Sequence, residues 1–496
     1  MLARLWSAFA REPIPALTDR IRAGETLVVR LADSRDLTGP VTLPITRDSD
    51  ARLTLHLAGV PYQDPAALVR ELKLGPAGDR LADELADSAA NLALARSVQP
   101  APDRGPPALA RYDLPGLEQC VVDGHPVHPL CRTRRGMSPD EVRAYAPEHR
   151  PVVHLRVYRV PERDWLSTGA GLPPELLVHP WQAEHVLPGH PRLTPTGATV
   201  PARPLMSLRT LALNERWHVK TAVDVQMTSA VRTVSPAAVR NGPVVSDLLA
   251  RLGQRAGIGV MREVAAGAVL VDGQPCRSLA MVRRLAPVPA PGGGLLPLAV
   301  LAAPSPASGA PIVTEAVALG YQGRPMAFVR ELVPLLLPPL LRLLYQGAAL
   351  EAHGQNTLVL LRGGRPRRLW YRDVGGVRLS GRRLSAYGVE VPPLHGDLPT
   401  DAPEVLRTKL FAALAVVLGE LAATLTRCYG TDPDAFWRVV ARSARATFAT
   451  LPGSGADADA LFGPTLPVKA YTAMRLARDP LTDLWTTIPN PMAGLS

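Results

Sequence analysis

The stretch that decides the fold is residues 207–232, SLRTLALNERWHVKTAVDVQMTSAVR. From Trp217 onward apolar and polar residues alternate, which is typical of a half-buried β-strand whose two faces differ in polarity. The members of the two faces are Val219, Val223, Val225 and Met227 on one side, and His218, Lys220, Asp224, Gln226 and Thr228 on the other. Together with the residues before Trp217, this alternation predicts a β-hairpin.

The polar face of the predicted hairpin is rich in hydrogen-bond donors and poor in carboxylates. Ser207, Arg209 and Thr210 precede its second strand, and Arg232 follows it. Donors of this kind bind phosphates and carboxylates. An ordinary strand with its charged side chains toward solvent gives the same pattern, so the pattern alone leaves both interpretations open.

Lysine is rare in this chain. Of the 55 basic residues only four are lysines, at positions 73, 220, 409 and 469. Lysine is a compact point charge that the planar guanidinium of arginine does not imitate, and phosphate sites often use that shape. A retained lysine in the hairpin therefore favours the anion-binding interpretation, although chance also accounts for any single one.

Length and cysteine content indicate a large protein of a reducing compartment. A chain of 496 residues is long enough for two or three packed units. Its four cysteines lie far apart and form no C-x-x-C pair, which argues against a disulfide framework and a structural zinc site. We expect a cytoplasmic protein.

Composition argues against membrane and nucleic-acid partners. Only six uncharged residues separate Arg4 from Arg11, too few for a signal-peptide core, and the apolar run 332–341 is too short to span a bilayer. The net charge of +11 comes from basic residues scattered among 44 acidic ones, and aromatic residues make up only 5%. Small anions such as nucleotides and polycarboxylates suit this balance.

Composition shifts divide the chain into three predicted regions of an α+β fold. Strand-like runs at residues 26–31 and 51–58 and a helical stretch begin region 1–182; the hairpin and further strands fill region 183–330. Region 331–496 is mostly helical, with an inserted hairpin at residues 357–379 and amphipathic stretches at 403–429 and 433–450. Residues 286–312, rich in Pro, Gly, Ala and Ser, are predicted to be a surface linker.

A second polar cluster surrounds that inserted hairpin. The loop His353-Gly354-Gln355-Asn356 precedes its first strand, and Asp373 follows its second. The hairpin should return Asp373 to the neighbourhood of His353 and Asn356. Asn and Asp supply the oxygen ligands that Mg²⁺ prefers, and phosphotransferases have a similar layout. The alternative is a plain helix end at Gly354 and a turn at Asp373.

The comparison with kinases fails at the loop. A kinase needs a carboxylate there to accept a proton from its hydroxyl substrate, but residues 353–356 contain no Asp or Glu, and no glycine-rich G-x-G-x-x-G precedes them. A carboxylate nucleophile needs no base because it is already ionised at neutral pH. It needs cations that overcome its repulsion from nucleotide phosphates, and the first hairpin carries them.

Three further features are weaker. The loop GHPVHP at residues 124–129, with His125 and His128, is followed by Arg132; we interpret it as a phosphate-facing loop, with an ordinary packed loop as the alternative. Arg284 could reach a nucleotide or face water. Lys469 is predicted to lie on a helix, where a solvated face is the default.

Taken in order, these segments resemble the IucA/IucC family, the synthetases that build siderophores without a nonribosomal peptide synthetase. The matching elements are the GHPVHP loop, His179-Pro180-Trp181-Gln182, Ser207-x-Arg209-Thr210, Lys220, Thr228-Ser229-x-x-Arg232, His353-x-Gln355-Asn356, Arg372-Asp373-x-Gly375, Lys469 and Asn490-Pro491. The resemblance implies a cupped-hand fold with a thumb-like region (1–182), a fingers-like region (183–330) and a palm-like region (331–496). Where the family usually has Lys in the His-Pro loop, this chain has Arg132.

The resemblance also implies a reaction and roles. ATP and a carboxylate give an acyl-adenylate and pyrophosphate, and an amine or hydroxyl then attacks to give an amide or ester. The implied ATP contacts are His125, His128, Arg132, Ser207, Arg209, Thr210, Lys220, Arg232, Arg284 and Gln355. The implied contacts of the substrate carboxylate are Thr228, Arg232, His353 and Lys469. Asn356 and Asp373 would hold Mg²⁺, and Lys220, Arg232 and His353 would be catalytic.

The leading hypothesis is therefore an ATP- and Mg²⁺-dependent ligase that joins citrate, or a citrate- or succinate-derived acid, to a polyamine or hydroxylated amine. The alternative is a kinase-like phosphotransferase that releases ADP; a non-catalytic binding protein is the third. A homodimer is plausible because symmetric oligomers are common.

Overall fold

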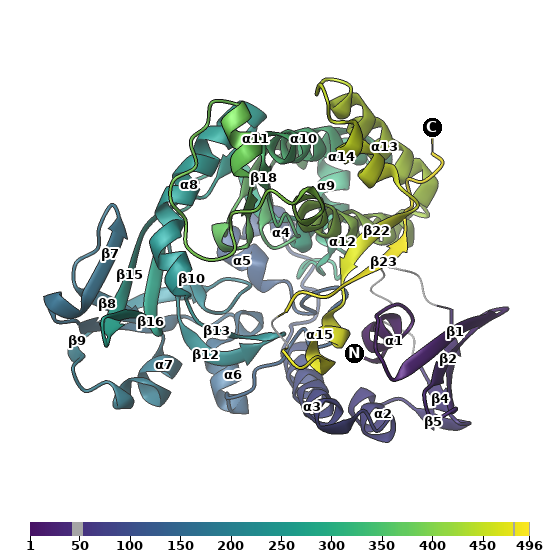
Figure 1. Cartoon of the computed structure of the whole chain (residues 1–496), viewed down its shortest axis with the longest axis horizontal. Helices are drawn as coiled ribbons and strands as arrows, with labels where there is room; N and C mark the ends of the chain where they lie inside the picture. Colours follow the sequence, from purple (N-terminus) through teal and green to yellow (C-terminus); the bar gives the residue numbers. More distant parts are fainter. Residues whose placement is uncertain (42–52, 480–481, 496) are drawn as a thin grey trace.

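The structure is a computed structural model that describes residues 1–41, 53–479 and 482–495. Figure 1 shows an N-terminal unit at the lower right, a large antiparallel sheet at the left and a mostly helical region at the top. This arrangement confirms the predicted α+β class with a helical C-terminal part.

The N-terminal unit is a five-stranded sheet flanked by helices. Its elements are α1 (Leu2–Phe9), β1 (Leu17–Ala23), β2 (Thr26–Leu31), β3 (Asp36–Pro40), β4 (Leu55–Leu57), β5 (Val60–Tyr62), α2 (Pro65–Glu71) and α3 (Gly75–Ser97). The predicted strand at residues 51–58 corresponds to β4, and its first two residues lie outside the described part of the chain. Two residues near the C-terminus, Ala470 and Ala473, belong to the apolar core of this unit.

The large sheet has eight strands in the order β7-β15-β16-β11-β10-β9-β6-β8. Its strands are β6 (Val153–Arg159), β7 (Trp165–Gly169), β8 (Glu175–Val178), β9 (Thr194–Pro204), β10 (Thr210–Ala212), β11 (Trp217–Thr221), β15 (Glu263–Val271) and β16 (Gln274–Leu285). The sheet takes strands from both sides of residue 182. The sheet therefore crosses the predicted boundary at residue 182, because strand pairing joins segments that sequence composition separates.

The stretch that begins at Ser207 forms two hairpins instead of one. β10 pairs with β11, and β12 (Val223–Met227) pairs with β13 (Ala230–Arg232) in a separate two-stranded sheet. The predicted wet face of β11 is also buried, since His218 and Lys220 are 1% and 7% exposed. Alternation distinguishes two faces of a strand, but it does not show that the rest of the protein covers the polar one.

The helical region is built around a four-stranded sheet in the order β14-β20-β19-β17. Its strands are β14 (Ile258–Val260), β17 (Gly293–Pro297), β19 (Thr357–Arg362) and β20 (Arg365–Tyr371); its main helices are α8 (Pro236–Ala256), α9 (Ile312–Tyr321), α10 (Pro325–Gln346), α12 (Pro403–Tyr429) and α13 (Pro433–Phe448). The predicted hairpin and both amphipathic helices are confirmed. Because β14 pairs with β20, this sheet crosses the predicted boundary at residue 330.

The predicted surface linker is instead largely part of the core. Residues 286–312 include β17 and the 3₁₀ helix η4 (Leu298–Ala302), and Leu295, Leu296 and Leu301 are buried. The Pro- and Gly-rich composition concealed this short apolar run. Its burial brings the end of the large sheet directly against the helical region.

Short elements complete the fold. They are α4 (Ala108–Arg111), α5 (Leu114–Gln119), α6 (Pro139–Tyr145), α7 (Pro180–His185), β18 (Ala348–Ala349), β21 (Arg378–Leu379), α11 (Gly381–Ala386), α14 (Gly455–Phe462), β22 (Thr465–Lys469), α15 (Tyr471–Leu476) and β23 (Trp485–Pro489).

Helix α12 is the core helix of the C-terminal region. Among the described residues it is the one helix long and apolar enough to cross a membrane, but 78% of its most apolar window is buried inside the protein. Its leucines and Phe411 pack into the largest apolar cluster of the molecule. Core packing therefore accounts for its apolar character.

Candidate functional site

The centre of the site is an ion pair between the two clusters that the sequence marks. Lys220 lies on β11, and its Nζ donates to both carboxylate oxygens of Asp373 at 2.9 and 3.1 Å. Lys220 faces the same side of the sheet as Thr210, its cross-strand partner on β10. Asp373 follows β20 with φ at 69°, a left-handed conformation that is costly for a residue other than glycine. Segments 153 residues apart thus meet at one point.

Arg284 joins this pair from the neighbouring strand β16. Its guanidinium is 3.9 Å from Asp373 and 2.9 Å from Glu263, which is also buried. Burial by itself would raise the pKa of Asp373, but Lys220 and Arg284 outweigh burial and hold that pKa well below its ordinary value. Asp373 is therefore an anion throughout the physiological pH range. Arg284 does not face water, because it is 2% exposed, and its contact with a nucleotide stays a prediction.

Two more arginines face Asp373 from the hairpin region. Arg209 donates to the carbonyl of Thr233, and burial, with Arg232 nearby, lowers its pKa to about 10. Arg232 donates to the carbonyl of Met227 at 3.2 Å and to the hydroxyl of Thr228. Both arginines stay charged at neutral pH. This group of side chains, called the cationic pocket below, combines the four cations Lys220, Arg209, Arg232 and Arg284 with the carboxylates of Asp373 and Glu263. Its excess of positive charge suits an anionic ligand.

The hairpin β19–β20 brings the metal-ligand candidates together. Thr357, the first residue of β19, pairs with Tyr371, the last residue of β20. Just beyond this pair, the N–H of Arg372 donates to the carbonyl of Asn356 at 3.0 Å. Asn356 is 6% exposed, and no described residue makes a hydrogen bond to its side-chain amide. An amide oxygen beside an ionised carboxylate is a donor set that Mg²⁺ accepts, so Asn356 and Asp373 fit the ion.

His353 lies at the start of this loop with Gln355. Burial lowers the pKa of His353, while the nearby Glu351 opposes the shift. The imidazole is therefore neutral at pH 7 and can donate or accept one hydrogen bond. Gln355 offers its backbone carbonyl to Arg372 at 3.1 Å, which ties the loop to the residue before Asp373.

The His-Pro loop reaches the same area from the N-terminal side. His128 Nε2 lies 2.7 Å from the hydroxyl of Ser229, in the turn between β12 and β13. The ring of Tyr471 packs against His128 and His125, with ring centroids 4.4 and 5.2 Å apart. Burial, reinforced by His125 and Arg232, holds the pKa of His128 well below its usual value, so this imidazole is neutral.

Arg132 has a different position from the other predicted ATP contacts. It is 3% exposed, lies 3.4 Å from Glu148, and donates to the carbonyls of Val121 and Val122. These contacts engage its guanidinium with the backbone just before the loop and with a later 3₁₀ helix, Pro147–His149. The geometry therefore supports the packed-loop alternative for Arg132.

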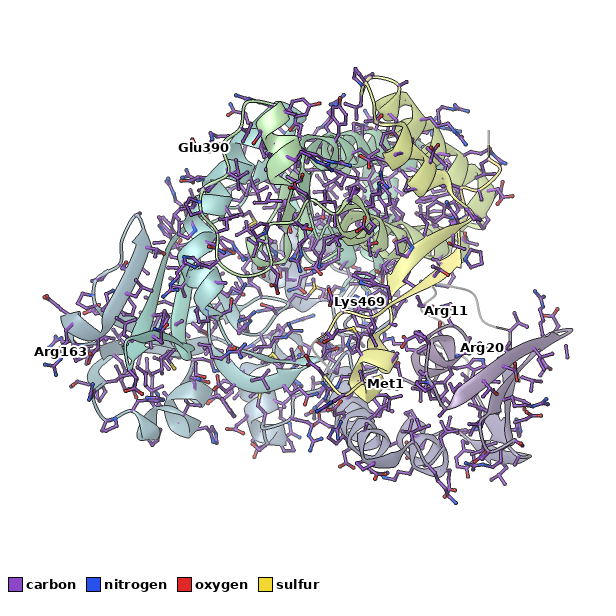
Figure 2. The ribbon with its side chains drawn as sticks, viewed as in Figure 1. Met1, Arg11, Arg20, Arg163, Glu390 and Lys469 are labelled. Carbon is purple, nitrogen blue, oxygen red and sulfur yellow. The ribbon has the colours of Figure 1, made fainter. Side chains whose placement is uncertain are left out.

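Lys469 is the last residue of strand β22, so the predicted helix position is wrong. The helix α15 begins two residues later, at Tyr471. The alternation of apolar and polar residues is too short there to distinguish the two structures. Lys469 pairs with Asp483 at 2.7 Å and lines a small cavity together with Arg11 of the N-terminal unit. Figure 2 labels both Lys469 and Arg11. It is placed where the N-terminal and C-terminal regions meet.

A groove adjoins the cationic pocket. His218 lines it two residues before Lys220, on the same face of β11, together with Ala212, Tyr112 and residues 287–295. Its volume of about 570 Å³ and its largely apolar wall are within the range of small-molecule sites. Burial, with Arg284 and Arg372 nearby, lowers the pKa of His218 to about 3, so its ring is neutral.

Sequence reasoning missed several residues of this site. Glu263, Glu118, Tyr471 and Asp483 carry no pattern that separates them from ordinary surface residues. Ser229 alone had a signal, because it lies within the Thr-Ser-x-x-Arg match. The others enter the site only through tertiary packing.

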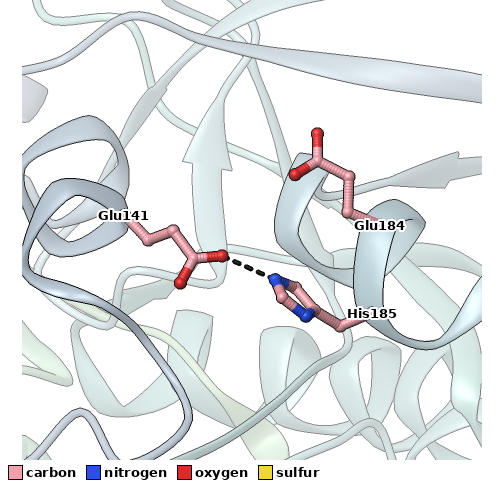
Figure 3. Close-up of side chains that lie close together, drawn as sticks. All are labelled: Glu141, Glu184 and His185. Carbon is pink, nitrogen blue, oxygen red and sulfur yellow. Dashed lines mark hydrogen bonds and ion pairs between the residues drawn. The ribbon is translucent and has the colours of Figure 1, made fainter.

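A separate cluster on the surface, shown in Figure 3, consists of Glu141, Glu184 and His185. His185 Nε2 and Glu141 Oε1 are 2.6 Å apart. The Glu184 carboxylate points away from that pair in Figure 3 and instead binds Arg156. The partners already present account for this cluster as surface ion pairs.

Comparison with known proteins gives two family matches. The model of the IucA / IucC family matches residues 113–171 and 175–303, and a model described as ferric iron reductase FhuF-like transporter matches residues 326–480. The second match contains one cysteine, Cys428.

Individual proteins show the same likeness. The chain is 30% identical to staphyloferrin A synthase of Staphylococcus aureus over 427 residues, which cover 77% of this chain and 73% of that protein. It is 22% identical to D-ornithine–citrate ligase of the same organism, covering 76% of this chain and 69% of the relative. The structure of ATP-bound aerobactin synthetase IucA from Klebsiella pneumoniae matches with a TM-score of 0.81 at 19% identity, over 99% of this chain and 98% of that one.

Proposed function

The chain belongs to the IucA/IucC family, and on that premise we propose that it is an ATP-dependent siderophore synthetase that adenylates a carboxylic acid and joins it to an amine or hydroxyl. The observation that carries this proposal is the pocket in which Lys220, Arg209, Arg232 and Arg284 surround Asp373. The family relationship supports ligase chemistry, and the comparisons lend no support to a phosphotransferase.

The pocket suits a reaction between two anions. A carboxylate that attacks the α-phosphate of ATP must approach a highly charged group, and buried cations lower that barrier by compensating the charge. We place Ser207, Arg209, Thr210, Lys220, Arg284 and Gln355 on the phosphates. Asn356 and Asp373 are the proposed ligands of Mg²⁺, whose chemistry is to bridge and neutralise phosphate oxygens.

The acid is expected at the Arg232 end of the pocket. Thr228, Arg232, His353 and Lys469 are its proposed contacts, with His125 and His128 bordering the phosphates. The largely apolar groove beside His218 adjoins the pocket on β11, and we place the nucleoside there. This orientation would leave the α-phosphate beside Lys220, between nucleoside and acid.

The substrate class follows from the relatives. We propose a polycarboxylic acid, citrate or an acid derived from citrate or succinate, and a polyamine or hydroxylated amine as acceptor. Names of the relatives include D-ornithine–citrate ligase and a rhizobactin siderophore biosynthesis protein, which supports this class. We expect the protein to act in the cytoplasm, and a homodimer stays a prediction.

Identification of the nucleotide product tests the proposal. The purified full-length chain should release AMP and pyrophosphate when ATP, Mg²⁺, a polycarboxylic acid and an amine are all present. Omission of the acid should abolish release. ADP as the product would establish a phosphotransferase instead, and no nucleotide turnover across a panel of di- and tricarboxylic acids would count against the ligase.

A further inference from the structure

A buried ion pair, Glu118–Arg372, links the loop before the cationic hairpin to the loops that carry Asn356 and Asp373. Glu118 lies on α5 and is 1% exposed, and Arg372, which precedes Asp373, is 3% exposed. Arg372 donates to Glu118 through both terminal nitrogens, at 2.5 and 2.9 Å. This bidentate geometry fixes the relative orientation of the two side chains.

Each partner also holds a loop of the pocket. Glu118 accepts a hydrogen bond of 2.9 Å from the backbone N–H of Met206, the residue before Ser207. Arg372 Nε donates to the carbonyl of Gln355 at 3.1 Å, and its backbone N–H donates to that of Asn356 at 3.0 Å. A single ion pair therefore contacts the loop that begins the cationic hairpin and both loops that carry the metal-ligand candidates.

We propose that Glu118 and Arg372 are positioning residues that set the distance between the cationic half of the pocket and its metal-binding half. The proposal rests on the proposed function, because the role of the pair is to keep Asn356 and Asp373 at the right distance from the phosphate contacts. Neither residue is among the proposed contacts of ATP, the acid or Mg²⁺. Ion pairs buried this deeply are costly to form, and apolar pairs of similar size often stabilise a fold equally well. The Glu118–Arg372 pair makes three hydrogen bonds to the pocket loops, to Met206, Gln355 and Asn356, and apolar side chains could not make the first two. These two bonds explain why an ion pair occupies this place.

The test uses two variants of the full-length protein. Glu118→Gln keeps the shape but leaves Arg372 as an uncompensated buried cation. The double variant Glu118→Met/Arg372→Met replaces both charges with flexible apolar side chains and is expected to fold even if the single variant does not. Both should lower kcat and raise the Mg²⁺ concentration for half-maximal activity, each by about 10-fold, as the loss of a supporting partner behind metal ligands does. The KM for the acid should change little.

Glu315→Gln is the matched control. Glu315 is also a buried carboxylate, but it accepts hydrogen bonds of 3.0 Å from the N–H groups of Ala108 and Leu109 and ties α9 to α4, away from the pocket loops. The Glu315→Gln variant should have an altered thermal stability, but its activity should depend on the Mg²⁺ concentration as the wild-type activity does.

A folded double variant with wild-type kcat and wild-type Mg²⁺ dependence would overturn the proposal. Calorimetric binding of ADP in the presence and absence of Mg²⁺ gives a readout that needs no ligase activity. Weaker Mg²⁺-dependent binding in the double variant supports the positioning role even if the wild-type protein forms no AMP. In that case the proposed reaction fails while the role of the pair stands.

Discussion

Among single residues, Lys220 has the position with the greatest expected effect on the reaction. Its ammonium group is the compact cation nearest to the expected α-phosphate, and three arginines around it keep the pocket positive when it is removed. Lys220→Ala should therefore lower kcat/KM for pyrophosphate release by about 10² to 10³, the usual effect of losing one group that stabilises developing charge. Steady-state assays with saturating acid measure this loss.

Ala212→Leu provides the contrast for that measurement. Ala212 lines the groove that we assign to the nucleoside, and the larger side chain should raise the KM for ATP while kcat stays near the wild-type value. An unchanged kcat/KM in Lys220→Ala would contradict the assignment of the pocket, and an unchanged KM for ATP in the groove variant would contradict only the place of the nucleoside.

At the scale of secondary-structure elements, His179 shows how a motif residue can serve the fold. It is the N-cap of α7, where its Nδ1 accepts the N–H of Trp181, and burial lowers its pKa to about 3. The ring is neutral in the folded state, whereas in the unfolded chain it takes up a proton near pH 6.5. Acidification below that pH therefore stabilises the unfolded state, and this residue weakens the fold progressively until the pH reaches the folded pKa.

His179→Asn should remove that pH dependence. Asparagine is a good N-cap and has no charge to gain. Between pH 7.5 and 5.5 the wild-type protein should lose about 1.4 kcal/mol more unfolding free energy than the variant, since one pH unit below the unfolded pKa corresponds to that amount. Urea unfolding at the two pH values measures the difference. An equal loss in both proteins would show that His179 is protonated in the folded state.

Elements with a strong local pattern were predictable, and those defined by pairing were not. The long helix α12, the hairpin β19–β20 and the meeting of Asp373 with Asn356 follow from periodicity and turn residues such as Gly363 and Gly364, both with positive φ. The break after Thr221 and the burial of β17 depend on which distant segment covers them. Patterns also marked Lys220 and Asp373 as separate groups, but their 2.9 Å contact is a property of the folded chain.

For the molecule as a whole, contacts between the first and last segments deserve a test of their own. Glu12, just after α1, accepts the N–H of Ala473 at 2.7 Å, and Arg475 pairs with Glu84 of α3. Burial raises the pKa of Glu12 to about 7. Because this value lies above that of the unfolded chain, the protonated carboxyl favours the folded state at acidic pH, and that contribution is lost as the pH rises from about 4.5 to 7.

Glu12→Gln should flatten this part of the stability profile. The amide stays neutral and can still accept from Ala473. Between pH 5 and pH 8 the wild-type protein should lose about 2.5 kcal/mol more unfolding free energy than the variant, as expected over this interval for a pKa of about 7 in the folded state and about 4.5 in the unfolded chain. Chemical denaturation followed at both pH values measures this. If the unfolding free energies of the wild-type protein and the variant changed equally between the two pH values, Glu12 would be ionised in the folded protein.

The same contacts bear on how the protein is made. The core of the N-terminal unit includes Leu130, Ala470 and Ala473, so its packing is complete only when residues from near the end of the chain arrive. Domains usually fold in the order in which the ribosome releases them. Here the N-terminal unit must wait, with part of its apolar surface uncovered, until Ala470 and Ala473 have been translated.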